Sequence, residues 1–119
     1  MRIILLQTGK TSERHISEGI EVYSARIKKL TGFEIITLPD VKNSRNMSEP
    51  ELKEKEGKKI LGSLKEGDYT VLLDEKGKEF RTVEFSSWLG NRLIQPPKRL
   101  VFVVGGAWGF AEEVYNKAD

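Results

Sequence analysis

Four short, largely apolar runs alternate with longer segments of helical periodicity, and this alternation is the feature that most restricts the fold. The runs lie at residues 3–6, 33–38, 69–73 and 100–104. Their length and the turn residues that follow them are typical of strands covered on both faces. Strands that alternate with helices favour a mainly parallel sheet with helices on both faces. We therefore predict an α/β fold in which residues 1–119 form a single domain.

The first helical segment carries one apolar stripe. Apolar residues follow one another at spacings of four, three, four and three from Ile16 to Leu30. This spacing predicts a helix with one buried face. Ser12 is the expected cap at its start, and Gly32 is expected to close it in the left-handed conformation.

The later helices carry start signals of their own. Ser48 and Glu51 form a capping box, with a proline tolerated in the first turn between them. Thr82 is the expected cap of the next helix, which should turn Trp88 inward as a core residue. A last helix is expected to begin near Ala111.

Parallel sheets of this kind bind ligands outside the carboxyl ends of their strands. Three segments of the predicted fold lie there, at residues 7–11, 73–77 and 105–110. These segments hold the candidate site.

Composition excludes several classes of site. The chain has no cysteine, so disulfides, thiolate metal sites and cysteine nucleophiles are excluded, and a reducing cytosol fits. His15 is the only histidine, so a multi-histidine metal site is excluded too. The 20 basic and 18 acidic residues give a net charge of +2, which neither indicates nor excludes a nucleic-acid partner. The opening run predicts a strand rather than a signal peptide, and no run approaches transmembrane length.

Two glycine-containing segments invite a nucleotide-binding interpretation. A G-K-T sequence begins at Gly9, but the full phosphate-loop pattern needs a glycine where Ile4 stands, so a strand-to-helix turn is favoured. The loop at residues 105–109 is rich in glycine but follows the last strand, whereas a dinucleotide loop follows the first. Its glycines allow close approach of a ligand to the backbone, and a plain turn is the open alternative.

Four further side chains are considered one by one, and two of them, Asp74 and Trp108, have two possible roles. Asp74, at the end of a strand, could accept a hydrogen bond from a ligand, although capping of the strand end is commoner. His15 is expected to be a partly exposed structural residue. Trp88 is expected in the core, whereas Trp108 stands in the glycine loop, where it either covers a ligand or packs against another segment.

Six motifs in order along the chain resemble the ribosomal RNA large subunit methyltransferase H family, a member of the knotted SPOUT class. Each is weak alone, and the six in register are specific. They are RIILLQTGK at 2–10, E-x-Y at 21–23 with Arg26, P-D at 39–40 with M-S at 47–48, K-E-G at 55–57, L-D-x-x-G-K at 73–78, and F-V-V-G-G-x-x-G at 102–109.

The resemblance implies methylation, dependent on S-adenosylmethionine, of the N3 atom of a pseudouridine in helix 69 of 23S rRNA. It implies a cytoplasmic homodimer that acts on the assembled ribosome, without a metal and without a membrane. It also implies that Leu73 and Gly106 line the cofactor site, and that Gly105 and Gly109 shape the same loop.

The sequence departs from the family in two respects. Trp108 stands where members usually carry a smaller or polar residue. The family also continues past Asp119, into a segment that holds the remaining cofactor loop, the trefoil knot, and a histidine, an arginine and a tyrosine near the reaction. We therefore expect a C-terminally incomplete domain, assign no catalytic residue to this chain, and expect the strand at 100–104 to lack a neighbour.

Two alternative functions remain open at this point. If the chain ends at residue 119, it could be an RNA- or ribosome-binding module without transfer activity. A nucleotide hydrolase is the third possibility, and it depends on the G-K-T sequence alone.

Overall fold

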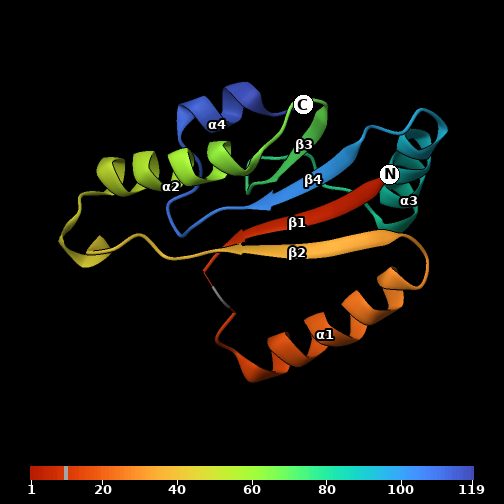
Figure 1. The fold of residues 1–119 in the computed structure, drawn as a ribbon, viewed down its shortest axis with the longest axis horizontal. Helices are drawn as coiled ribbons and strands as arrows, with labels where there is room; N and C mark the ends of the chain where they lie inside the picture. Colours follow the sequence, from red (N-terminus) through yellow and green to blue (C-terminus); the bar gives the residue numbers. More distant parts are fainter. Residues whose placement is uncertain (10) are drawn as a thin grey trace.

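The computed structural model describes residues 1–9 and 11–119, and the four strands in these residues form one parallel sheet (Figure 1). The strands are β1 (Arg2–Thr8), β2 (Gly32–Leu38), β3 (Asp68–Leu73) and β4 (Arg99–Val104). Their order across the sheet is β2-β1-β4-β3. The predicted α/β fold with a parallel sheet is confirmed.

The helices in the described part of the chain connect or follow these strands. They are α1 (Arg14–Lys28), the short 3-10 helix η1 (Ser44–Asn46), α2 (Glu49–Ser63), α3 (Thr82–Ile94) and α4 (Glu112–Lys117). None of these helices has both the length and the apolar character that a bilayer crossing requires.

The position of β4 corrects one expectation. Its apolar sequence predicted a central strand, and it pairs with β1 on one side and with β3 on the other. The expectation that it lacks a neighbour is therefore wrong. The reason is topological, because the fourth strand inserts between the first and the third instead of adding to an edge.

Helices cover both faces of the sheet, as predicted. On one face Ile4, which lies opposite Val101, packs in a core with Ile60 of α2 and Val114 of α4. In Figure 1, α2 and α4 lie together above the strands. On the other face, α3 brings Trp88 within 6.2 Å, between ring centroids, of Phe102 on β4. Side chains alternate along a strand, so Val101 and Phe102 point to opposite faces.

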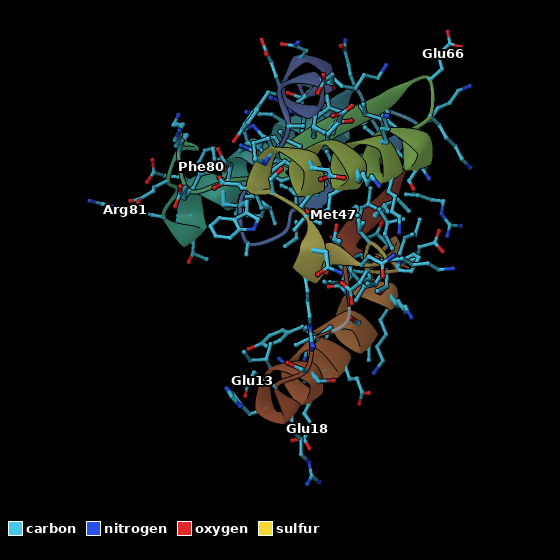
Figure 2. The ribbon with its side chains drawn as sticks, turned by 90° about the vertical axis from the view of Figure 1, so that its left-hand side faces the viewer. Glu13, Glu18, Met47, Glu66, Phe80 and Arg81 are labelled. Carbon is cyan, nitrogen blue, oxygen red and sulfur yellow. The ribbon has the colours of Figure 1, made fainter. Side chains whose placement is uncertain are left out.

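Helix α1 forms where predicted, but its apolar stripe is not buried. None of its residues is fully buried, and Tyr23 is 64% exposed. In Figure 2 the helix projects from the rest of the molecule, with Glu13 and Glu18 at its outer side. The cause is the sheet order, since β2 is an edge strand and α1 meets the sheet mainly there.

Some helix ends were predicted correctly and others were not. The Ser48 side chain caps α2 by accepting a hydrogen bond from the backbone N–H of Glu51 at 3.3 Å, as predicted. Ser12 does not cap α1, whose N-cap residue is Glu13, and Gly32 is already the first residue of β2. Thr82 is the first residue inside α3 and not its cap. Helix α3 begins one residue earlier than expected because the Glu84 carboxylate accepts a hydrogen bond from the Arg81 N–H at 3.1 Å.

Candidate functional site

The four residues that the family resemblance assigned to cofactor binding lie around one hollow. It has a volume of about 360 Å³ and lies at the carboxyl ends of β3 and β4. Leu73 is the last residue of β3, and the loop that follows β4 contains Gly105, Gly106 and Gly109. This is the edge at which parallel sheets bind ligands. The fold thus brings the four residues together, and their role toward a cofactor stays a prediction.

Close contacts explain two of these glycines. A β-carbon on Gly105 would come within 2.8 Å of the ring of Phe110, which is buried in the core. A β-carbon on Gly106 would come within 2.7 Å of the Glu56 carboxylate oxygen Oε1. At Gly105 and Gly106 the loop therefore lies against the core and α2 without room for a side chain, and their backbone faces the hollow.

A tight turn completes the loop. The Gly109 N–H donates to the Gly106 carbonyl at 3.2 Å, and Gly109 has a φ of 85°, a conformation that favours glycine. Ala107 and Trp108 occupy the two positions between these glycines.

The charged residues that line the hollow in the described part of the chain are all acidic. They are Glu49, at the start of α2, and Asp74 and Glu75, which follow β3. Carboxylates attract cations and accept hydrogen bonds from N–H groups, and they repel phosphates. The hollow is therefore suited to a cationic ligand or to a neutral group with N–H donors.

Asp74 has a partner within the protein. It accepts a hydrogen bond from the Tyr115 hydroxyl on α4 at 2.9 Å. Partial burial, followed by this hydrogen bond and the Asp74 charge, raises the pKa of the Tyr115 hydroxyl above its ordinary value, so the tyrosine stays a donor. Sequence reasoning missed Tyr115, since the two residues are 41 positions apart and no spacing links them.

A second acidic group lies behind the glycine loop. Glu56, on α2, contacts Gly106, while Asp40, beyond the end of β2, contacts Gly9 at the end of β1. Burial, and then the negative charge of Asp40, raises the pKa of Glu56 above its ordinary value. Sequence reasoning recognised Glu56 within the K-E-G motif without assigning it a role, because its neighbours come from other elements.

Glu56→Gln is expected to raise the unfolding temperature at neutral pH. The folded-state pKa of Glu56 lies above the ordinary value of 4.5, so its ionisation destabilises the folded state relative to the unfolded chain. The advantage of the variant should appear as pH rises through the folded-state pKa and vanish below about pH 4.5. Thermal unfolding between about pH 4 and pH 8 measures it. Glu54→Gln, at an exposed position of the same helix, should show no such pH-dependent gain.

The remaining candidate residues differ in their exposure and in their surroundings. His15 is exposed on α1, and its structural role stays a prediction. Trp88 is half-buried in an aromatic cluster, less deeply than a core residue, whereas Trp108 is 53% exposed on the rim of the hollow. In the G-K-T segment, Gly9 has a φ of 74° and donates to the Leu38 carbonyl at the end of β2 at 2.8 Å, which extends the pairing of β1 with β2. Lys10 lies outside the described residues.

A larger hollow of about 770 Å³ shares Leu73 and Asp74 with the first. It lies where α3 incompletely covers β3 and β4, and aromatic rings such as Phe85 and Phe102 line it. It contains none of the three loop glycines, so the smaller hollow is the better candidate for a ligand. Among the described residues, no group of three or more histidine, aspartate or glutamate side chains is placed to hold a metal ion.

Comparisons with known proteins agree with this architecture. The family described as "Predicted SPOUT methyltransferase" matches residues 1–119. Ribosomal RNA large subunit methyltransferase H of Parabacteroides distasonis is 50% identical over 119 residues, which cover 100% of this chain and 76% of the relative. The proteins of the same name from Phocaeicola vulgatus and Christiangramia forsetii are 45% and 42% identical, with the same coverage.

Proposed function

Because the chain belongs to the SPOUT methyltransferase family, in its ribosomal RNA large subunit methyltransferase H group, we propose that it methylates the N3 atom of a pseudouridine in helix 69 of 23S rRNA with S-adenosylmethionine. Its identity of 50% with a relative of that name supports rRNA as the substrate class. The proposal assigns the reaction to the hollow at the ends of β3 and β4.

The acidic, glycine-lined hollow is the observation that carries the proposal. S-adenosylmethionine has a positive sulfonium and a positive ammonium group, and the charged residues described around the hollow, Glu49, Asp74 and Glu75, are of the opposite sign. Leu73 is 49% exposed and offers an apolar surface. The chemistry of the lining therefore fits this cofactor, which Leu73, Gly105, Gly106 and Gly109 would hold.

The cofactor, when bound, supplies a methyl group that is already activated by the positive sulfur. The residues of the chain then have the tasks of orienting the ligand and excluding water. The bare backbone of Gly105 and Gly106 allows close approach, and the Gly106–Gly109 hydrogen bond at 3.2 Å fixes the loop. The N3 proton of the base has to leave before or during methyl transfer, and no residue within 1–119 is assigned to accept it.

The proposal includes a homodimer that acts on the assembled ribosome in the cytoplasm. The exposed apolar stripe of α1 supports self-association, since Ile16 and Tyr23 are 46% and 64% exposed. The trefoil knot belongs to the segment of the family beyond residue 119 and stays a prediction. The chain spans 76% of the length of the relatives.

Transfer of a labelled methyl group tests the proposal. Ribosomes from a strain without the modification are incubated with the protein and radiolabelled S-adenosylmethionine, and we expect label in 23S rRNA. Nucleoside mass spectrometry should identify 3-methylpseudouridine, and ribosomes that already carry the modification are the control.

Two results would contradict this assignment in different ways. Binding to ribosomes without transfer of label would favour an RNA- or ribosome-binding module instead. Preference for ATP over S-adenosylmethionine in a binding measurement would favour the nucleotide hydrolase.

A further inference from the structure

Trp108 is held by backbone geometry at the tip of a turn. The Gly109 N–H donates to the Gly106 carbonyl at 3.2 Å, and these two glycines form an isolated antiparallel bridge. Trp108 is the residue before Gly109, whose φ of 85° sets the direction of the turn. The turn fixes the backbone of Trp108 and the direction in which its side chain leaves the loop.

The two tryptophans differ in their surroundings. The ring of Trp88 lies within 5.7 Å of the ring of Phe85 and within 6.3 Å of that of Tyr69, between centroids. Trp108 is 53% exposed and has no aromatic or cation–π partner among the described residues. An exposed indole is a surface on which a nucleobase can stack.

The surroundings of Trp108 favour a base over a phosphate. It lines the same hollow as Leu73 and Gly105, and the charged residues described there are acidic. Negative side chains repel the sugar–phosphate backbone of RNA, whereas they accept hydrogen bonds from the ring N–H groups of a uracil-like base. Sequence-specific proteins commonly recognise unpaired RNA bases by stacking them on aromatic side chains.

We propose that Trp108 binds the target nucleotide by stacking on its unpaired, uracil-like base at the mouth of the hollow. This inference rests on the proposed function, because it assigns the indole to the RNA substrate of that reaction. The acidic rim then meets the N–H edge of the base, and the phosphates stay outside.

Intrinsic fluorescence tests the stacking independently of catalysis. The probe is an RNA hairpin with a pseudouridine in its loop, added to the wild-type protein and to Trp108→Phe. The chain has two tryptophans, so the variant reports Trp88 alone. We expect the hairpin to quench the wild-type emission and to leave that of the variant nearly unchanged. Equal quenching in both proteins would overturn the inference.

Kinetic measurements distinguish a role of Trp108 in binding the RNA substrate from a role in binding the cofactor. Trp108→Ala is expected to raise the KM for ribosomes roughly 10- to 100-fold, the loss typical of one stacked base, and to leave the KM for S-adenosylmethionine unchanged. Trp108→Phe, which keeps a ring, should lose no more than about threefold. The unfolding temperature should stay constant, since the side chain is half-exposed.

Other outcomes would identify a different role. A rise in the KM for S-adenosylmethionine alone would assign the indole to the cofactor, and a lower unfolding temperature or loss of self-association would make it structural. Each of these results overturns base stacking. Absence of methyl transfer by the wild-type protein would instead refute the proposed function, while the hairpin quenching still reports the stacking.

Discussion

Replacing Asp68 with alanine is expected to lower the free energy of unfolding by about 3 kcal/mol, the low end of the range for breaking a buried ion pair. Asp68 begins β3, and its partner, Arg99, begins β4. Their side chains are only 3% and 13% exposed. Loss of the carboxylate would leave the guanidinium largely buried without its counter-charge.

The geometry explains why this pair matters more than others. Arg99 donates to both carboxylate oxygens of Asp68, at 2.8 and 2.7 Å, and also to the Ser63 carbonyl at the end of α2, at 3.1 Å. Burial alone raises the pKa of Asp68, but hydrogen bonds from Arg99 and from the Lys65 N–H outweigh it and hold that pKa below its ordinary value. The pair thus ties α2, β3 and β4 together at the end of the sheet opposite the hollow.

Denaturant unfolding measures this effect, and an exposed pair provides the control. Glu34 and Arg2 form an ion pair at 2.9 Å with side chains 46% and 57% exposed, so Glu34→Ala should cost less than about 1 kcal/mol. Asp68→Ala combined with Arg99→Met should be more stable than Asp68→Ala alone, because no buried charge is left unpaired. If Asp68→Ala and Glu34→Ala lower the free energy of unfolding equally, the buried pair contributes no more to stability than the exposed pair.

Local patterns predicted the elements of this fold, and they could not predict the contacts between elements. The strand at 100–104 was expected to be central because it is apolar, and it is. Its insertion between β1 and β3 depends on the packing of the whole chain, so the sequence interpretation wrongly left it without a neighbour. The Ser48 side-chain cap is local and was predicted correctly, whereas the start of α1 and the exposure of its stripe depend on tertiary structure.

The same distinction applies to the candidate site. Leu73 ends one strand and the loop glycines follow another, and the rule that parallel strands bind ligands at their carboxyl ends was enough to predict that they meet. The Glu49, Glu56 and Tyr115 side chains come from α2 and α4, and no spacing in the sequence links them to the loop. Sequence reasoning had already placed Asp74 and Glu75 at this edge, so only the contribution of Glu49 to the acidic lining emerged from the structure.

Substitution of the two loop glycines should separate folding from ligand binding. Gly105→Ala forces a β-carbon to within 2.8 Å of the buried Phe110 ring, so it should cost about 1–3 kcal/mol of stability, as overpacking does. Gly106→Ala displaces only the end of the flexible Glu56 side chain and should cost far less. If the loop backbone binds the cofactor, both variants should still bind S-adenosylmethionine at least about tenfold more weakly, the effect of losing roughly 1.4 kcal/mol.

Calorimetric titration and thermal unfolding, carried out on the same variants, decide between these effects. Gly62→Ala, in α2 with open space around it, is the control and should gain about 0.5–1 kcal/mol of stability without a change in affinity.

Glu56→Ala combined with Gly106→Ala removes the displaced carboxylate. If affinity returns in that double variant, the loss came from the movement of Glu56. If it does not, the loss came from a displacement of the loop backbone by the added methyl group, as the proposed cofactor site requires. Unchanged affinity in Gly106→Ala would remove this glycine from the site, whatever its stability.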